Sequence, residues 1–442
     1  IKTPLWYCKV DEKNTVIWAN FFNVDPNEKM VEINVRQAVF YPSQPGINYI
    51  GVSGFVMSQA ATPWAPPTAE QIGLIGTHWS KGWVIENNDI SYSKCVGITL
   101  GKYGDEWDNK SESVEGFTKT IERAPDHSWN KDHIGSHVVR NNQISHCGQA
   151  GIAGSLGAIF STISGNSIHD IAEQKLFWGY EMAGIKLHAA IDVEISHNHI
   201  YRTEGGIWLD WMAQGTRVTK NFLHDNRVQD FSLEVDHGPV LVDNNLFLSP
   251  QLAQVRLSQG VAFVHNLIAW KLWETNDVDP RQTPFLKPNS TTIAGFHNNP
   301  CGDTRFYNNV FLGSTDLSPY NNATLPVQME GNVYLMDAQP SKYEQQPVRK
   351  PDYNPAVEVV EKNGKWYLSI NLEKSWSDKI RPKPVTGKLL GTAVIPEQSF
   401  EYINGNPVLL NTDYLGRERS TKNPVAGPFE ITKSGRQQIK VW

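Results

Sequence analysis

The sequence lacks three features that would each indicate a class of protein. Its 442 residues contain no apolar run of about 18, so we expect no membrane-spanning helix. Cysteine is scarce: four residues without a CxxC pair predict buried, reduced thiols rather than a disulfide framework. The sequence also lacks a large excess of charge of one sign, because its net charge is only −6. Such a small net charge indicates neither a nucleic-acid nor a membrane-surface partner. With no signal peptide, these absences predict a cytoplasmic protein.

A short motif recurs along the chain: Asn, then any residue, then an apolar one. Its basic spacing is 21–24 residues, with longer steps where loops interrupt it. A fixed period of this length is typical of a solenoid, in which each unit buries its apolar face against its neighbours. The motif begins at Asn88, Asn142, Asn166, Asn198, Asn221, Asn245, Asn266, Asn309 and Asn332.

The residues before each motif alternate between apolar and polar, as in Ser136 to Arg140, and this favours strands over helices. Leucine-rich repeats share the period, but their leucine framework is missing. We therefore predict an all-β fold, a right-handed parallel β-helix with long loop insertions and a C-terminal tail. The Asn residues are given a structural role, because Asn tolerates left-handed turns and stacked copies can form amide ladders.

Three segments divide the chain. Residues 1–80 are predicted to form early coils and a Pro-containing loop, with a strand at 31–36. Residues 81–336 hold the regular coils and the candidate site. Residues 337–442 lose the period; we expect a hairpin turning at Asn363-Gly364, and a tail that covers the solenoid, because exposed edges invite aggregation.

Three loop insertions interrupt the regular coils. They lie at residues 102–135, between residues 166 and 184, and at residues 271–303. The second insertion brings Trp178 and Glu181 to the entrance of the following strand. Loops on one side of a rigid solenoid usually form its binding face. We therefore expect these insertions to wall a substrate site.

Two carboxylates occupy the same place in consecutive coils. The segments 206–210 and 230–234 align apolar on apolar, so Asp210 and Glu234 share one outward-facing column. Coils of a parallel β-helix lie about 4.8 Å apart, and acids at roughly 5 Å are the pair that a retaining glycosidase needs. One acid would attack the anomeric carbon while the other protonates the leaving oxygen. The spacing alone does not say which acid takes which role.

The same alignment places other polar side chains on this face. His188 precedes Asp210 in the column, whereas Lys186, Trp208 and Arg256 fall two positions earlier in their strands. We expect His188 and Trp208 to contact a sugar, and Lys186 and Arg256 to pair with the acids. The alternative is an ordinary solvated face on which these polar residues have no common purpose.

The residues after Glu234 are also candidates. Asp236 and His237 follow it closely, and we expect them to orient it at the edge of the substrate site. No tight metal-ligand spacing of His and carboxylates is present, so we predict neither a catalytic metal nor another cofactor.

Two other functions stay open at this point. A β-helix polysaccharide lyase would bind Ca²⁺ with clustered acids and abstract a proton with a basic residue such as Lys186 or Arg256. A non-catalytic sugar-binding solenoid would retain its binding when Asp210 and Glu234 are changed conservatively. An inverting hydrolase is disfavoured, because its acids lie farther apart.

The two acids lie in long motifs, GGIWLDWMAQGTR at residues 205–217 and EVDHGP at residues 234–239. Both motifs, with the segments 31–36, 59–68 and 81–88, resemble glycoside hydrolase family 120. The resemblance implies a right-handed parallel β-helix and a retaining, exo-acting β-xylosidase. Such an enzyme would release xylose from the non-reducing ends of xylo-oligosaccharides, its expected partner.

The resemblance also implies individual roles. The Asp of the family's WLDW run is the nucleophile, which implies Asp210, and the Glu before its Val-x-His-Gly-Pro run is the acid/base, which implies Glu234. A Glu in the loop before the preceding strand contacts the sugar, which implies Glu181. Family members carry an inserted β-sandwich, and we expect it to be missing here or to lie on another chain. Association with such an N-terminal segment and homo-oligomerisation both stay open.

Overall fold

The structure is a computed structural model, and it describes residues 5–66, 68–108, 114–177, 181–275, 279–376, 382–431 and 433–442. The chain divides into two compact units, Ile1–Val35 and Arg36–Trp442.

The first unit contains an antiparallel hairpin. Its strands are β1 (Trp6–Val10) and β2 (Thr15–Ala19), and the short 3-10 helix η1 (Pro26–Glu28) follows. The strand predicted at residues 31–36 is wrong: these residues are exposed and form no strand paired with another strand. An alternating sequence needs such a partner to become a strand, which is why the pattern misled here.

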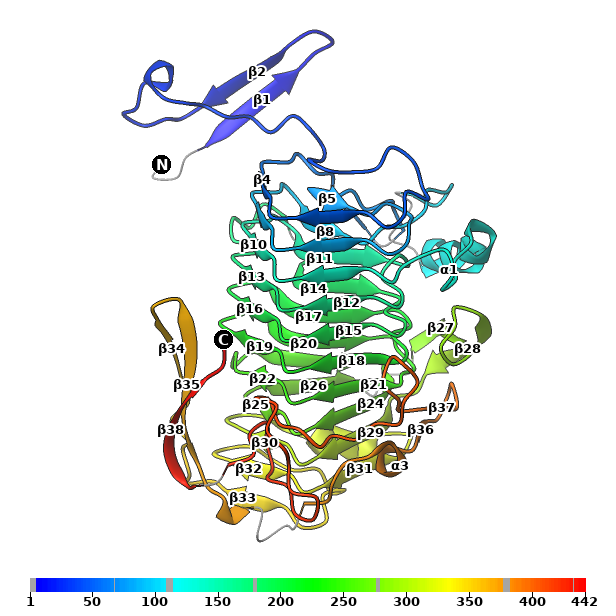
Figure 1. The fold of residues 1–442 in the computed structure, drawn as a ribbon, viewed down its shortest axis with the longest axis vertical. Helices are drawn as coiled ribbons and strands as arrows, with labels where there is room; N and C mark the ends of the chain where they lie inside the picture. The colour runs from blue at the N-terminus through cyan, green and yellow to red at the C-terminus, as the bar shows by residue number, and fades with distance from the viewer. Residues whose placement is uncertain are drawn as a thin grey trace. The chain divides into compact units, whose positions relative to one another are not determined.

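The second unit is a parallel β-helix whose coils stack one upon another (Figure 1). Successive coils contribute strands to three parallel sheets, called sheets I, II and III, and the strands of each sheet follow chain order.

Sheet I contains β5 (Ile75–Gly76), β8 (Val96–Thr99), β11 (Ala150–Ser155), β14 (Ala183–His188), β17 (Gly205–Asp210), β20 (Gln229–Glu234), β23 (Leu252–Arg256) and β26 (Lys271–Thr275). Sheet II contains β3 (Gly51–Ser53), β6 (Val84–Glu86), β9 (Val138–Arg140), β12 (Thr162–Ser164), β15 (Glu194–Ser196), β18 (Thr216–Thr219), β21 (Val240–Asp243), β24 (Gln259–Val264), β29 (Gly302–Tyr307) and β31 (Val327–Glu330). Sheet III contains β4 (Val56–Ser58), β7 (Asp89–Ser91), β10 (Gln143–Ser145), β13 (Ser167–His169), β16 (His199–Tyr201), β19 (Phe222–His224), β22 (Leu246–Phe247), β25 (Leu267–Ile268), β30 (Val310–Phe311), β32 (Val333–Leu335) and β33 (Val348–Lys350).

The core consists of apolar side chains stacked from coil to coil. In sheet I, Ile98, Ile152, Ile185, Ile207 and Phe231 pair in register, and all five are fully buried. Burial of each such side chain contributes about 1.5–3 kcal/mol. Because neighbouring residues of a strand face opposite sides, this inward column fixes which side chains of sheet I point outward.

The Asn motif forms a ladder along the interior. Asn221 Oδ1 accepts from the backbone N and from Nδ2 of Asn198, at 2.9 and 3.0 Å, and its own Nδ2 donates to Asn245 Oδ1 at 3.0 Å. The pattern repeats in each neighbouring pair from Asn88 to Asn332, where the last amide donates to Glu344. The predicted structural role of these residues is confirmed.

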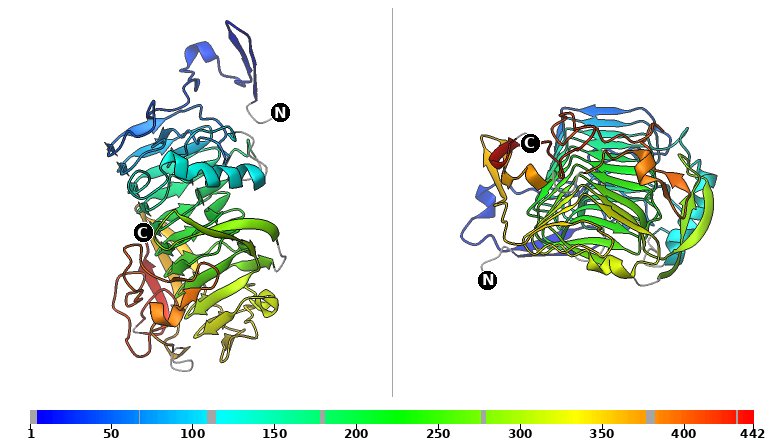
Figure 2. Two further views of the ribbon diagram at one scale, coloured as in Figure 1. Left: turned by 90° about the vertical axis from the view of Figure 1, so that its right-hand side faces the viewer. Right: turned by 90° about the horizontal axis from the view of Figure 1, so that it is seen from below.

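The first and third insertions contribute elements that lie outside the three sheets. The first insertion forms α1 (Val114–Arg123) and η2 (Ala124–His127), and the third forms the antiparallel pair β27 (Asp279–Leu286) and β28 (Ile293–Asn299). Figures 1 and 2 show α1 and this hairpin on the same side of the solenoid. No helix in the described part of the chain is long and apolar enough to cross a membrane.

The C-terminal residues form two additions to the solenoid. A three-stranded sheet lies on sheet III, where the Trp366 ring is 4.9 Å from the ring of His199. Its Lys362–Lys365 pair flanks the predicted Asn363-Gly364 turn, which is confirmed. The sheet consists of β34 (Glu358–Lys362), β35 (Lys365–Leu372) and β38 (Gly435–Lys440). The second addition contains α3 (Gly387–Leu390), β36 (Thr392–Ala393) and β37 (Gln398–Ser399). The short 3-10 helix η3 (Ser318–Asn322) lies earlier in the chain, between β30 and β31 of the solenoid.

The ladder predicts a measurable contribution to stability. Asn221→Ala would leave buried donors and acceptors on the coils above and below without partners, and each such group costs about 1–3 kcal/mol. We expect the free energy of unfolding in urea to fall by at least about 2 kcal/mol. Gln143→Ala, on an exposed site of β10, is the control and should change it by less than about 0.5 kcal/mol. Equal changes in both variants would contradict the ladder's role.

Candidate active site

The outward face of sheet I carries a column of ionisable side chains. Strand register pairs His188 with Asp210, Asp210 with Glu234, and Glu234 with Arg256. The predicted adjacency of Asp210 and Glu234 in one column is therefore present in the structure. Arg256 differs from the alignment, which placed it two positions earlier. The coil from Glu234 to Arg256 is 22 residues long, whereas the preceding one is 24, so counting along the sequence misplaced it.

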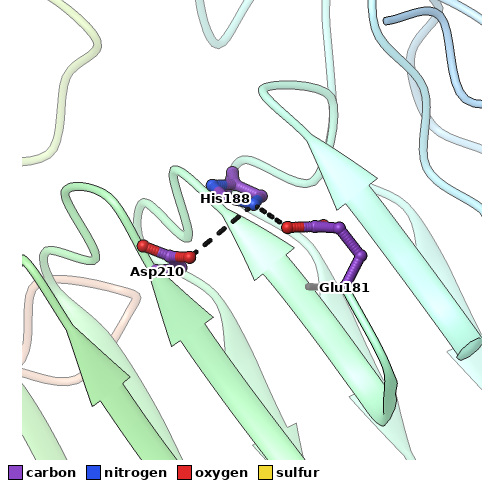
Figure 3. A group of neighbouring side chains, drawn as sticks. All are labelled: Glu181, His188 and Asp210. Atoms are coloured by element: carbon purple, nitrogen blue, oxygen red, sulfur yellow. Dashed lines mark hydrogen bonds and ion pairs between the residues drawn. The ribbon is translucent and has the colours of Figure 1, made fainter. Parts of the chain in front are cut away.

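Lys186, two residues before His188 in β14, lies among the carboxylates. Its Nζ is 2.6 Å from Asp210 Oδ2 and 3.5 Å from Glu181 Oε1. His188 Nε2 lies 2.8 Å from the same Glu181 oxygen and 3.8 Å from Asp210 Oδ2 (Figure 3). The loop residue Glu181 is thus drawn to the column by two side chains of the strand that follows it.

Trp208 covers the ammonium group. Lys186 Nζ lies 3.4 Å from the centre of the Trp208 ring, within the range of a cation–π contact. The indole itself is half-buried, so one part of it is available to a ligand. On the other side of the column, Arg256 donates to Glu234 Oε1 at 3.0 Å. Each catalytic candidate therefore has its own cationic neighbour, as predicted for Lys186 and Arg256.

The pKa values of the two glutamates move in opposite directions. Burial, together with the charge of Asp210, raises the pKa of Glu234 above its ordinary value, and Lys186 and Arg256 offset only part of this. Burial alone would also raise the pKa of Glu181, but His188 and Lys186 outweigh it and leave that pKa below the ordinary value. The site therefore favours a protonated Glu234 beside an ionised Glu181.

Several buried polar atoms of this face have no protein partner among the described residues. They are Glu181 Oε2, His188 Nδ1, Trp208 Nε1, Asp210 Oδ1, Ser232 Oγ and Asp236 Oδ2. Unpaired buried polar groups are costly and are rare unless a ligand or water satisfies them. A sugar presents hydroxyl groups that both donate and accept, which matches this mixed set. Ser232 had no distinguishing signal in the sequence, because Ser is common on any outward strand face.

Two insertions wall this face. Phe117 of α1 has its ring 5.1 Å from His188 and 4.5 Å from Trp211, the residue after Asp210. From β27, the guanidinium of Arg281 lies 5.8 Å from the Trp211 ring. The first and third of the three predicted insertions thus lie beside the column. Phe117 itself was missed, because one Phe in an irregular stretch of sequence carries no pattern. The predicted sugar contact Trp178 lies outside the described residues.

His237 does not join the column. It is buried, its Nε2 donates to the Thr283 carbonyl at 3.1 Å, and the Gln259 amide contacts its other ring nitrogen. Burial lowers its pKa to about 4, so the ring is neutral and attaches the β27–β28 hairpin to the loop after Glu234. Asp236 accepts from the Ala213 N–H, which joins that loop to the one after Asp210. Both residues position the surroundings of the acids.

One group of side chains at this site also resembles a metal site. It consists of Glu181, His188 and Asp210, whose ligand atoms lie within 4.8 Å of one another (Figure 3). The Lys186 ammonium already supplies positive charge at both carboxylates, and a cation beside it would be repelled. Ca²⁺ in particular requires six to eight oxygen ligands. The donor set therefore fits an ammonium-bridged pair of acids and does not fit the calcium-dependent lyase.

The ammonium predicts a strong effect on stability. Lys186→Met removes the cation but leaves buried carboxylates, and breaking a buried pair in this way costs about 3–5 kcal/mol. We expect a clearly lower thermal unfolding temperature, measured by circular dichroism. Lys119→Met, which breaks the exposed Lys119–Glu122 pair of α1, is the control and should leave the temperature nearly unchanged. A Lys186→Met protein as stable as this control would contradict the ion-pair arrangement.

Comparisons with known proteins agree with this geometry. Residues 72–268 match the family described as the right handed beta helix region, which confirms the predicted fold class and its handedness. A solved structure titled "The complex structure of XylC with xylose" is 41% identical, with a TM-score of 0.94. The match covers 99% of this chain and 74% of that one. A comparison with curated protein sequences gave no match.

The N-terminal unit corrects one expectation. Residues 2–33 match the glycoside hydrolase 120 insertion domain, so sequence of the insertion that was expected to be missing is present in this chain. The expectation failed because the strands of a short hairpin alternate apolar and polar residues in the same way as the strands of an early coil. The sequence pattern therefore did not distinguish the two. With the insertion-domain match and the 41% identity over nearly its whole length, the chain belongs to glycoside hydrolase family 120.

Proposed function

We propose that this glycoside hydrolase is a retaining, exo-acting β-xylosidase that removes xylose from the non-reducing ends of xylo-oligosaccharides. The observation that carries the proposal is the register of Asp210 and Glu234 on adjacent strands. One strand spacing, about 4.8 Å, is the separation typical of the two acids in a retaining enzyme. The related XylC structure contains xylose, which supports a pentose as the sugar.

Asp210 is the proposed nucleophile. Its Oδ2 is held by Lys186 at 2.6 Å, while Oδ1 is buried without a protein partner and is free to attack the anomeric carbon. Glu234 is the proposed acid/base, since its raised pKa favours the protonated form that the first step requires. As Oδ1 bonds to the sugar, Glu234 gives its proton to the glycosidic oxygen and the leaving group departs.

The second step uses the same two residues. Once Asp210 is esterified its negative charge is gone, so one cause of the raised Glu234 pKa disappears and the carboxylate becomes a base. It then takes a proton from water, whose oxygen attacks the anomeric carbon and releases Asp210. Two displacements on one carbon return the original β configuration.

The remaining groups bind the xylose. Glu181, kept ionised by His188 and Lys186, has a free oxygen that can accept from a sugar hydroxyl. Trp208 offers its indole N–H, and Ser232 a hydroxyl that can donate or accept. Trp178 completes the proposed contacts, and His237 supports the site by positioning the β27–β28 hairpin.

We also propose a cytoplasmic location. The four cysteines are free thiols and three of them are buried. Burial raises the pKa of Cys95 to about 11, which keeps its thiol protonated and unreactive.

Retention is tested by the product itself. Proton NMR of p-nitrophenyl β-xyloside hydrolysis should show β-xylose first, before mutarotation.

Addition of azide distinguishes the roles of the two acids. With 2,4-dinitrophenyl β-xyloside, Glu234→Ala should form β-xylosyl azide and Asp210→Ala should form α-xylosyl azide. Without azide, we expect Asp210→Ala to lose at least about 10⁴-fold in kcat. Glu330→Gln, in β31, is the control and should retain activity. α-Xylose as the first product would refute the assignment.

The pH dependence follows from Glu234. Activity requires its proton and is lost as the pH rises through its pKa, so the raised pKa extends activity to higher pH than an ordinary glutamate would allow. Arg256 lowers this pKa, and Arg256→Gln should therefore shift the alkaline limb of kcat/KM to still higher pH. A profile measured on p-nitrophenyl β-xyloside checks the direction. A shift to lower pH would contradict the role of Glu234 as the acid.

A further inference from the structure

We infer that Phe117, on the inserted helix α1, makes the sugar site selective for pentoses. Its ring and that of Trp211 lie on the side of the site where the C5 methylene of xylose is placed, and they exclude the hydroxymethyl group of a hexose. The inference rests on the proposed function and identifies a residue that determines the class of sugar it accepts.

The side of the acid column from which the strands arrive is polar. Trp208 and Ser232 precede Asp210 and Glu234 by two residues, or about 7 Å of strand, and Lys186 holds the same position one strand earlier. The Trp208 indole nitrogen and the Ser232 hydroxyl are buried without a protein partner among the described residues. This side therefore offers hydrogen bonds to sugar hydroxyls.

The side on which the strands end is apolar. Ala189, Trp211 and Val235 directly follow the residues of the column and have left-handed backbones, with φ of 54°, 45° and 63°. Because the chain turns at these residues, their side chains leave the strand alternation and join an apolar cluster that is separate from the solenoid core and includes Phe117. Trp211 is the largest of the three, and the Phe117 ring meets it edge-on at 4.5 Å.

A xylopyranose ring has the same two sides. From the anomeric carbon, one edge begins at C2 and bears hydroxyl groups, whereas the other consists of the ring oxygen and C5, a methylene without a substituent. With the anomeric carbon at Asp210 Oδ1, the hydroxyl edge pairs with the polar side, so C5 faces Trp211 and Phe117. Glucose has the same configuration from C1 to C4, but its hydroxymethyl group on C5 would enter the apolar side.

The apolar side has little space for such a group. Phe117 and Trp211 are 4% and 6% exposed, similar to the 7% and 8% of Asp210 and Glu234 at the reacting centre. Extra atoms in a closely packed site displace side chains, and a hydroxyl between two rings loses its contacts with water. Both effects disfavour a hexose relative to a pentose.

Helix α1 holds the Phe117 ring in place. Its buried face consists of Gly116, Phe117, Thr120 and Ile121. The Tyr103 hydroxyl donates to the Thr120 carbonyl, and Ile121 is fully buried in the same apolar cluster as Phe117. A wall fixed in this way cannot move aside for a larger sugar, so the selectivity resides in the size of the side chain at position 117.

Phe117→Ala tests the inference on three p-nitrophenyl β-glycosides that differ only at C5: the xyloside, the 6-deoxyglucoside and the glucoside. Selectivity is the ratio of kcat/KM on the xyloside to kcat/KM on the glucoside, which is independent of the fraction of enzyme that folds. We expect a ratio of at least about 100 for wild type. Phe117→Ala should lower it at least about tenfold, with a parallel gain for the 6-deoxyglucoside. Phe117→Leu, which keeps an apolar side chain in the cluster, should give an intermediate ratio.

Ile121→Ala is the matched control, because it removes a buried side chain of the same cluster one turn further along α1. Its ratio should stay within about twofold of wild type. An unchanged ratio in both Phe117 variants, or an equal fall in Ile121→Ala, would overturn the inference. Equal wild-type activity on xyloside and glucoside would also overturn it, yet leave the retaining mechanism intact. A wild-type enzyme inactive on every β-xyloside would overturn the proposed function as well.

Discussion

The hydrogen-bonded spacing between successive coils is the constraint on which the site depends. Parallel strands lie about 4.8 Å apart, and this distance becomes the separation of any two groups placed in one column. The stacked apolar side chains and the Asn ladder fix the register, so Asp210 and Glu234 cannot slip relative to each other. The rigid interior thus sets the geometry that a loop-borne site would have to obtain from many separate contacts.

Charge balance is the second requirement of this arrangement. Three buried carboxylates, those of Glu181, Asp210 and Glu234, would repel one another without a cation. Lys186 pairs directly with the first two, whereas Glu234 forms its ion pair with the half-exposed Arg256. Against its burial, His188 and Lys186 hold the pKa of Glu181 below its ordinary value, whereas burial and the charge of Asp210 raise the pKa of Glu234 and the cations offset only part of this rise. The two effects separate a binding carboxylate from a proton donor.

The sequence predicted those features that repeat. The period, the Asn ladder and the register of Asp210 with Glu234 all follow from aligning coils of nearly equal length. Features that occur only once in the sequence were not predictable. These are the shorter coil that brings Arg256 beside Glu234, and the position of Phe117, which contacts this face from α1. Burial of the outward face was also missed. The alternation of apolar and polar residues shows only which side chains point away from the solenoid interior. The groups that cover them come from the insertions, whose sequences do not repeat.

The burial of that outward face changes how the surrounding electrolyte acts on the enzyme. On an open solenoid, ions approach a column of charges closely and screen it over a Debye length of about 8 Å at physiological ionic strength. Here α1 and the β27–β28 hairpin flank the column, and Lys186 has no exposed surface. Mobile ions cannot enter between the ammonium and its carboxylates, so the field at the reacting carbon is set by fixed protein charges and varies little with dissolved salt.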